Sequence, residues 1–138
     1  MILKKQGTHQ INVYFFKKEN TWGENMDLQV ELLEENSVQR FKIVGEIDAF
    51  TAPKLRECLA PAEKLTEMQA ELDLSEVEYV DSTGLGVFVG FYKAVKANGG
   101  HVKIIGVNSR LKRLFEITGL SEVMDIAIEE SRDEDAGV

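Results

Sequence analysis

Val80-Asp81-Ser82-Thr83-Gly84-Leu85-Gly86 is the stretch around which this chain is organised. An apolar run typical of a β-strand precedes it, and a segment with the apolar spacing of a helix follows it. The stretch therefore predicts a strand-to-helix junction at which Asp81 or Ser82 caps the helix. The hydroxyls of Ser82 and Thr83 then lie at the positive end of the helix dipole, where a phosphate can be held or attached to a serine. The plain alternative is a helix cap with no further role.

The composition favours one domain that binds protein or small-molecule partners. A chain of 138 residues can bury a single core, and a net charge of −8 argues against nucleic acid and against an anionic membrane surface as partners. The lone cysteine, Cys58, lies on an apolar helical stripe, which predicts a buried side chain and a reducing, cytoplasmic location. His9 and His101 stand apart in the sequence, so no metal-ligand spacing exists and neither a metal nor another cofactor is expected.

The apolar periodicity from Asp27 onward predicts the order β-β-α-β-α-β-α-β. This order indicates a single α/β domain with a mixed sheet, an opening hairpin around the turn at 35–37, and helices mainly on one face. In chain order we expect strands near 28–32 and 38–44, a helix from about 51 to 65, a strand near 70–74, a helix from about 83 to 97, a strand near 102–105, a short helix from about 109, capped by Asn108 or Ser109, and a strand near 123–128.

The first predicted helix has a clear start and a disturbed end. Thr51 supplies a hydroxyl for the cap and Pro53 is a favourable early proline. Leu55, Leu59, Ala62 and Leu65 form its apolar stripe, and Pro61 should bend or interrupt it.

The two ends of the chain differ from its middle. Residues 1–25 carry four lysines and two glutamates, whereas the remainder has a net charge of −10. We expect residues 1–25 to be an extension outside the core of a domain over 26–128. Alternatively, translation starts at Met26, because residues 22–25 must be encoded by a purine-rich run like those that position bacterial ribosomes. Residues 129–138 are acidic and poor in apolar side chains, which predicts a flexible tail.

Asp48 and Ser82 are both expected where a strand ends and a helix begins. In open α/β sheets such ends lie on one rim, and ligands bind there. The helix that follows Ser82 has its expected core stripe at Leu85, Phe88, Val89, Tyr92 and Val95, with Val87, Phe91 and Ala94 on the opposite side. That second apolar side either meets a partner or is covered by a neighbouring helix. Gly84 and Gly86 lack a Cβ atom, so another molecule's backbone can approach them.

Three blocks of sequence carry a resemblance to a known family. They are Gly45-Glu46-Ile47-Asp48, Asp81-Ser82-Thr83-Gly84-Leu85-Gly86 and Ile117-Thr118-Gly119-Leu120. In this order and spacing the chain resembles the anti-sigma-factor antagonists, the bacterial branch of the STAS domain, over about 27–128. Through 80–90 and 113–120 it is most similar to the branch that controls the general stress response of Gram-positive bacteria. Residues 1–25 depart from the pattern, because the family typically lacks them.

The resemblance implies a phosphorylation switch without catalysis by this chain. The unmodified protein would bind an anti-sigma factor that is also a serine kinase, and would thereby free the sigma factor. That kinase, which brings its own ATP and Mg²⁺, would phosphorylate Ser82, and a metal-dependent serine phosphatase would remove the phosphate. The residues expected to contact the partner are Asp48, Asp81, Ser82, Thr83, Gly84 and Leu85, together with Val87 and Phe91 if the second apolar side of the helix meets the partner.

Two other functional classes fit these residues less well. An enzyme with Ser82 as nucleophile would need a base, and no Gly-x-Ser-x-Gly motif or histidine motif supplies one. A nucleotide-binding loop would need a lysine after Gly84-Leu85-Gly86, and none is present. We therefore expect no catalytic residues. The alternative to the antagonist function is a STAS-type module that senses a ligand or serves as a scaffold in another signalling assembly.

Overall fold

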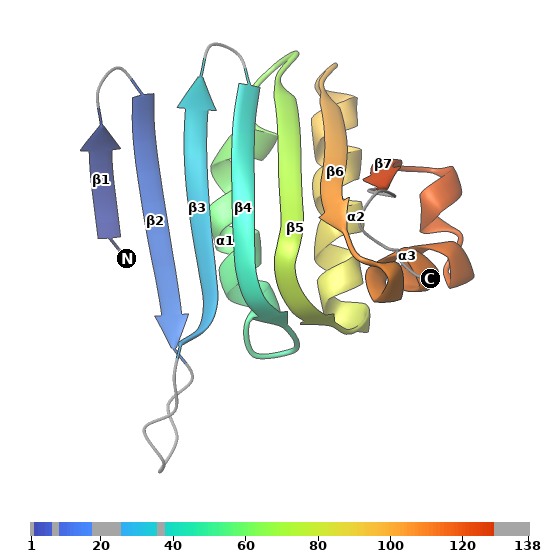
Figure 1. Cartoon of the computed structure of the whole chain (residues 1–138). Helices are drawn as coiled ribbons and strands as arrows, with labels where there is room; N and C mark the ends of the chain where they lie inside the picture. Colours follow the sequence, from blue (N-terminus) through green and yellow to red (C-terminus); the bar gives the residue numbers. More distant parts are fainter. Residues whose placement is uncertain (1, 7–8, 18–25, 36–37, 129–138) are drawn as a thin grey trace.

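The computed structural model describes residues 2–6, 9–17, 26–35 and 38–128. Within them, one sheet of seven strands holds β1 to β7 side by side in chain order (Figure 1). The strands are β1 (Ile2–Gln6), β2 (His9–Lys17), β3 (Met26–Glu35), β4 (Val38–Ile47), β5 (Gln69–Val80), β6 (His101–Val107) and β7 (Asp125–Ile128). The helices are α1 (Ala52–Glu63), α2 (Ser82–Ala97) and α3 (Ser109–Ile117), followed by a short 3-10 helix, η1 (Leu120–Glu122).

The sheet is mixed, as the sequence predicts. Strands β1 to β4 pair antiparallel, and β4 to β7 pair parallel. From β3 onward the order is β-β-α-β-α-β-α-β, with the antiparallel β3–β4 pair as the opening hairpin, so the predicted fold class is confirmed. Figure 1 shows α1 and α2 on the same face of the sheet, with α3 beside β6 and β7. The predicted turn residues 36–37 lie outside the described residues.

Strands β1 and β2 extend the sheet beyond the predicted fold. β2 pairs antiparallel with β3, in a register that runs from Gln10 opposite Glu34 to Lys17 opposite Met26. The predicted extension over 1–25 therefore contains two strands, which the sequence does not reveal. Residues 18–25 and the predicted tail over 129–138 lie outside the described residues. The domain limits at 26 and 128 stay predictions.

The sheet has one apolar face and one polar face. Alternating side chains of β3 to β6 are buried beneath α1 and α2, and burial of each large apolar side chain stabilises the fold by roughly 1.5–3 kcal/mol. These residues are Leu28, Val30, Leu32, Phe41, Ile43, Ala70, Leu72, Leu74, Val102 and Ile104.

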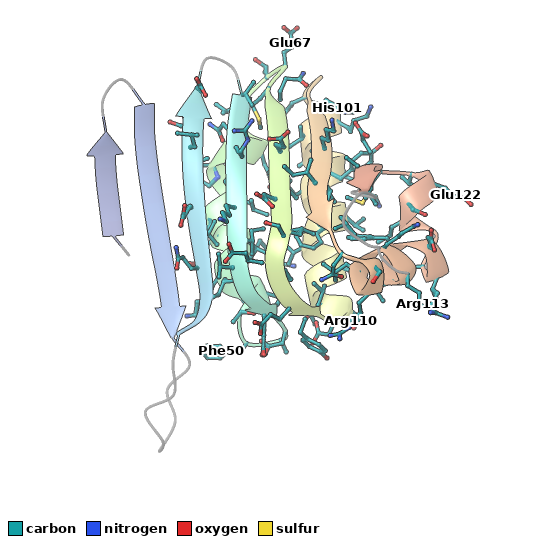
Figure 2. The ribbon with its side chains drawn as sticks, viewed as in Figure 1. Phe50, Glu67, His101, Arg110, Arg113 and Glu122 are labelled. Atoms are coloured by element: carbon teal, nitrogen blue, oxygen red, sulfur yellow. The ribbon has the colours of Figure 1, made fainter. Side chains whose placement is uncertain are left out.

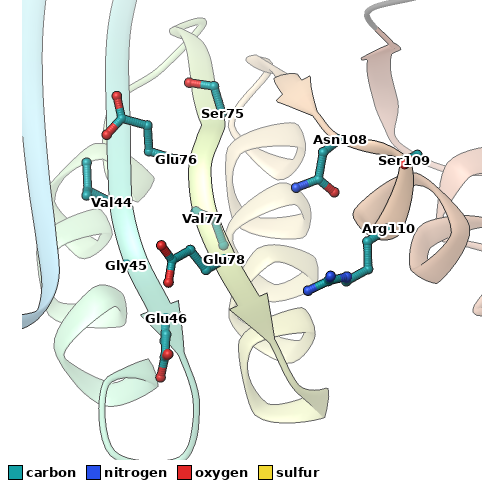
Figure 3. A pocket seen from close by; sticks show the side chains of 10 residues that line it. All are labelled: Val44, Gly45, Glu46, Ser75, Glu76, Val77, Glu78, Asn108, Ser109 and Arg110. Carbon is teal, nitrogen blue, oxygen red and sulfur yellow. The ribbon is translucent and has the colours of Figure 1, made fainter. Parts of the chain in front are cut away.

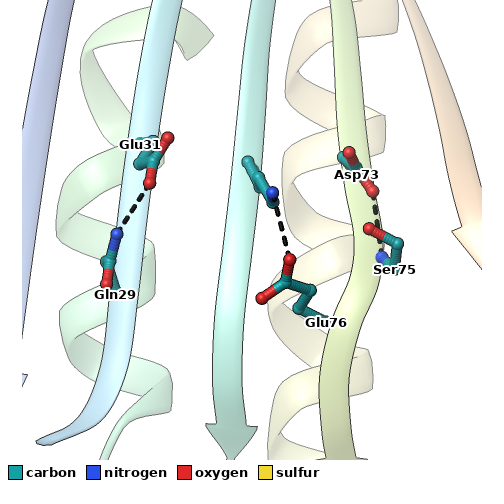
Figure 4. A network of polar contacts seen from close by, with 6 residues as sticks. Gln29, Glu31, Asp73, Ser75 and Glu76 are labelled. Atoms are coloured by element: carbon teal, nitrogen blue, oxygen red, sulfur yellow. Dashed lines mark hydrogen bonds and ion pairs between the residues drawn. The ribbon is translucent and has the colours of Figure 1, made fainter.

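The opposite face carries charged and polar side chains that pair with one another. Lys42 Nζ lies 3.1 Å from Glu76 of β5, and Gln29 Nε2 donates to Glu31 over 2.7 Å (Figure 4). The first pair joins the neighbouring strands β4 and β5, and the second joins two residues on the same face of β3. Exposed ion pairs of this kind contribute about 0–1 kcal/mol each, so the apolar face decides the stability of the sheet.

The helix ends follow the sequence signals in most cases. Asn108 Oδ1 accepts a hydrogen bond from the amide of Leu111 over 2.8 Å, so Asn108 and not Ser109 caps α3. Gly99, which follows the end of α2, has a φ of 80°, a left-handed conformation that glycine adopts without strain. The predicted stop after Ala97 is therefore confirmed.

The end of α1 differs from the prediction. The helix continues two residues past Pro61 and ends at Glu63, so Pro61 lies in its last turn and does not interrupt it. Leu65 was expected on the apolar stripe, yet it is 41% exposed because the helix has ended before it. Leu55 and Leu59 are fully buried, as expected.

Candidate functional site

The candidate site lies where β4 and β5 end. The last residues of these parallel strands, Ile47 and Val80, are paired in register, and the amide of Asp81 donates to the carbonyl of Ile47 over 3.1 Å. Asp48 and Asp81 therefore follow two adjacent strand ends. The predicted common rim for Asp48 and Ser82 is confirmed, at the end of the sheet to which the β4 and β5 arrows point in Figure 1.

Asp81 is the N-cap of α2, one of the two residues that the sequence offers for this role. Its backbone is extended, with φ of −105° and ψ of −171°. Its carboxylate accepts hydrogen bonds from the amides of Thr83, over 2.9 Å, and Gly84, over 3.2 Å, and from the hydroxyl of Thr83. These donors stabilise the charged form, the Thr83 hydroxyl most of all, and they hold the pKa of Asp81 below its usual value.

Ser82 and Thr83 differ in what their hydroxyls do. Both residues are exposed in the first turn of α2. The Thr83 hydroxyl is bound to Asp81, whereas the Ser82 hydroxyl makes no hydrogen bond to any residue that the structure describes. The free amides of the first helical turn and the helix dipole favour an anion at this position. Of the two exposed hydroxyls, that of Ser82 is therefore the one without a partner among the described residues.

Asp48 shapes the neighbouring loop between β4 and α1. Its carboxylate accepts from the amides of Phe50, over 2.9 Å, and Thr51, over 3.0 Å. The Thr51 side chain is fully buried and donates its hydroxyl to the carbonyl of Glu46 over 2.8 Å. The prediction that Thr51 caps α1 with its hydroxyl is therefore wrong, because that hydroxyl bonds within the β4–α1 loop and accepts no hydrogen bond from an amide of α1.

The two glycines of the junction have different surroundings. Gly84 is buried, and a Cβ atom there would lie 2.6 Å from Cγ2 of Ile47 and 2.9 Å from Cγ1 of Val80. A Cβ at Gly86 would meet nothing within 4 Å. Gly84 thus lets α2 pack closely on β4 and β5 of its own chain, so only Gly86 remains as a place where another backbone can approach.

The structure corrects the prediction for the outer side of α2. Val87 is 3% exposed and Phe91 is 1% exposed, so neither lies on an accessible surface. The ring of Phe91 meets the ring of Phe41 on β4 edge to face, with 6.0 Å between centroids, and α1 packs beside α2. The alternative of cover within the chain therefore holds. Leu85 is partly buried and packs against the core.

Two exposed apolar side chains near this rim were not expected. Tyr79 is 50% exposed and Ile117 is 74% exposed. The register of β4 and β5 shifts between Gly45 and Glu46, which interrupts the strict alternation before Tyr79. Ile117 lies about 160° around α3 from the buried Phe115 at 100° per residue, so a helical wheel was the signal that could have placed it outside the core.

A hollow on the polar face of the sheet lies apart from these residues. It is lined by β4, β5 and the start of α3, including Glu46, Glu76, Glu78, Asn108 and Arg110 (Figure 3). None of the predicted site residues lines it. Among the residues that the structure describes, no three His, Cys, Asp or Glu side chains form a group that could hold a metal ion.

The Cys58 side chain is buried in α1. Burial raises the pKa of the Cys58 thiol to about 12, which keeps it protonated at neutral pH. In the described part of the chain, none of the helices combines the length and the apolarity needed to cross a membrane.

Comparisons with known proteins agree with the fold. Residues 29–134 match the STAS domain family. The anti-sigma-B factor antagonist of Bacillus subtilis is 46% identical over 104 residues, which are 74% of this chain and 93% of that protein. A crystal structure of an anti-sigma factor antagonist from Mycobacterium paratuberculosis has a TM-score of 0.62 and 26% identity, covering 75% of this chain and 87% of that one. The phosphorylated form of the Bacillus cell fate determinant SpoIIAA shares the fold, with a TM-score of 0.56 and 20% identity over 74% of this chain and 92% of that one.

Proposed function

We propose, on the premise that this chain belongs to the STAS domain family and within it to the anti-sigma factor antagonists, that Ser82 is the switch of its antagonist activity. Members of this family are binding proteins and not enzymes. In the unmodified state the chain binds an anti-sigma factor, and the sigma factor held by that protein is released. Since sigma factors act with RNA polymerase, we expect this exchange in the cytoplasm.

The free hydroxyl of Ser82 is the observation that carries the proposal. Ser82 is exposed at the first position of α2, and its hydroxyl has no partner among the described residues. A kinase can therefore reach it without first breaking a hydrogen bond. Phosphorylation of Thr83 would instead remove the hydroxyl proton that Asp81 binds.

The charge of a phosphate explains why the switch acts on binding. A phosphoserine carries about −1.5 to −2 charges at neutral pH. The N-terminus of α2 stabilises an anion by about 0.3–1 kcal/mol, so the free protein tolerates the phosphate. A partner surface that fits the small Ser82 hydroxyl beside the carboxylates of Asp48 and Asp81 does not tolerate the added negative charge. The two states then differ in affinity and share one fold.

The partners follow from this cycle. The anti-sigma factor is the serine kinase, and it brings ATP and Mg²⁺ in its own site. A metal-dependent serine phosphatase restores the hydroxyl of Ser82 and with it the binding. This chain supplies the acceptor residue and the docking surface.

Titration against the anti-sigma-B factor of Bacillus subtilis tests the proposal. Ser82→Ala is expected to bind within about two-fold of the unmodified chain, and Ser82→Asp at least about ten-fold more weakly, as for loss of a central contact. Thr66→Asp is the matched control, because it places the same charge at an exposed hydroxyl residue in the turn before β5, at the opposite end of the sheet. Equal affinities of Ser82→Asp and Thr66→Asp would contradict the switch. Absence of any binding would favour a ligand-sensing or scaffold role instead.

A further inference from the structure

The rim that carries Ser82 continues into an apolar groove between β5 and α3. Tyr79 and Val80 contribute to it from β5, and Leu114 and Ile117 contribute from α3. Val80 is only two residues before Ser82, so the groove begins beside the phosphorylation site. We call this surface the α3 groove.

The α3 groove leaves apolar surface in contact with water. Ile117 is the most exposed of the large apolar side chains in the described residues, at 74%, and Tyr79 is exposed at 50%. Among the other apolar residues of α3, Leu111 and Phe115 are 3% and 1% exposed, and Leu114 is partly buried. Ile117 therefore contributes little to the core, and contiguous exposed apolar surface of this kind marks interaction sites.

Two arginines give the groove a positive border. Arg110 and Arg113 line it, both are exposed, and neither forms an ion pair with any described residue. Figure 2 shows both arginines toward the end of the sheet at which Phe50 of the β4–α1 loop lies, and away from Glu67 and His101 at the other end. Glu78 is the only carboxylate among the lining residues. Guanidinium groups beside apolar walls fit a partner segment that combines apolar and acidic side chains.

A stable interface also needs more surface area than the junction alone supplies. A specific complex buries about 800 Å² on each partner, from roughly 20–30 residues. The exposed part of the junction consists of the β4–α1 loop and the first turn of α2. A protein that covers Ser82 also lies close to the α3 groove, because Tyr79 and Val80 line the groove and directly precede Asp81 and Ser82 in the chain.

We propose that the α3 groove is a second part of the surface that binds the anti-sigma factor, and that it receives an apolar and acidic segment of that protein. This inference rests on the proposed function, because it names the surface used by the same partner. The groove supplies affinity and orientation, whereas Ser82 supplies the switch.

Two groove variants and two matched controls test this assignment. Ile117→Asp puts a charge into the apolar wall, and its control Leu65→Asp does so at an exposed leucine, 41% exposed, beyond the far end of α1. Arg113→Glu reverses a border charge, and its control Lys93→Glu makes the same charge change at an exposed position of α2, about 16 Å along the helix from Ser82.

The anti-sigma-B factor of Bacillus subtilis is the probe, titrated first with the wild-type chain. We expect both groove variants to bind at least about ten-fold more weakly and both controls to bind within about two-fold of wild type. Thermal melts of all four variants identify any loss of affinity that comes from unfolding, and Arg113→Glu keeps the test decisive if Ile117→Asp is poorly folded.

The outcomes separate this inference from the proposed function. If the wild-type chain binds and both groove variants bind equally well, the inference fails and the function stands. If affinity is unchanged but sedimentation shows a wild-type dimer that Ile117→Asp dissociates, a second copy of the chain occupies the groove, which also overturns the inference. If the wild-type chain does not bind the probe, the proposed function fails and the inference fails with it.

Discussion

The hydroxyl of Thr83 donates a hydrogen bond to the carboxylate of Asp81, two residues before it in the chain. The same carboxylate accepts hydrogen bonds from the amides of Thr83 and Gly84. Asp81 therefore accepts three hydrogen bonds at the junction, and none of them comes from Ser82. In the first turn of α2, the hydroxyl of Thr83 is thus bound to Asp81, whereas the neighbouring hydroxyl of Ser82 is free for modification. This difference makes Ser82 the residue that accepts the phosphate in the proposed switch.

Replacing Asp81 by Asn should remove a pH-dependent part of the stability. The hydrogen bond from the Thr83 hydroxyl, followed by the amides of Gly84 and Thr83, lowers the folded-state pKa of Asp81. A carboxyl with a lowered pKa stabilises the fold above its unfolded pKa of about 3.9, and this contribution is lost as the pH falls through the folded value. Asn caps helices equally well and does not titrate.

Melting temperatures of the wild type and Asp81→Asn are the measurement for this prediction. We expect the wild type to be more stable near pH 6, and the gap between the two proteins to close as the pH is lowered to about 3 or below. A gap that stays constant over this range would show that the Asp81 carboxylate has no special role in the junction.

Substitution of Gly84 by Ala should destabilise the domain, whereas Gly86→Ala should not. The new methyl at Gly84 would overlap Cγ2 of Ile47 and Cγ1 of Val80, neither of which is the end of a long flexible side chain. Such overpacking costs about 1–3 kcal/mol in the free energy of unfolding. Gly86→Ala meets no neighbour and gains up to about 1 kcal/mol of helix propensity. Chemical denaturation of both variants provides the comparison, and equal stabilities would contradict the packing described for Gly84.

Truncation of Phe91 to Ala should lower the free energy of unfolding by about 3–5 kcal/mol, as for a core phenylalanine. Its ring is 1% exposed and packs edge to face on Phe41. Binding to the anti-sigma factor should change little at a temperature at which the variant is folded, because the ring is not on the surface. Urea denaturation gives the first quantity and calorimetric titration the second. A small loss of stability together with a large loss of affinity would restore the interface interpretation for Phe91.

Deletion of residues 1–25 should leave a domain that folds and binds its partner. The match to the STAS domain family covers residues 29–134 and leaves the extension out. Differential scanning calorimetry and the same binding titration compare the two lengths. If the melting temperature falls by several degrees, the pairing of β2 with β3 contributes to stability and the extension belongs to the domain.

The sequence predicts well those features that depend on local signals. Alternating apolar residues place β3 and β4, and capping side chains place the starts of α2 and α3. The rim shared by Asp48 and Ser82 follows from the general rule for strand ends in parallel sheets. Each of these predictions needs only neighbouring residues or one rule of topology.

Features that depend on distant contacts escaped prediction. α2 is apolar around most of its surface, so the pattern alone could not show that Phe91 faces Phe41 of β4. Strand β2 has one short apolar run, and its place in the sheet depends on the pairing with β3. The exposure of Ile117 is different, because its position on the α3 wheel did carry a usable signal.

The role of Ser82 as the phosphorylated residue is tested most directly by locating the phosphate after incubation with the kinase. The full chain, Ser82→Ala and Thr83→Ala are each incubated with the anti-sigma-B factor of Bacillus subtilis and Mg-ATP, and the modified residue is located by tandem mass spectrometry. We expect one phosphate on Ser82 in the wild type and in Thr83→Ala, and none in Ser82→Ala. Phosphate on Thr83 in the wild type, or undiminished incorporation into Ser82→Ala, would contradict it.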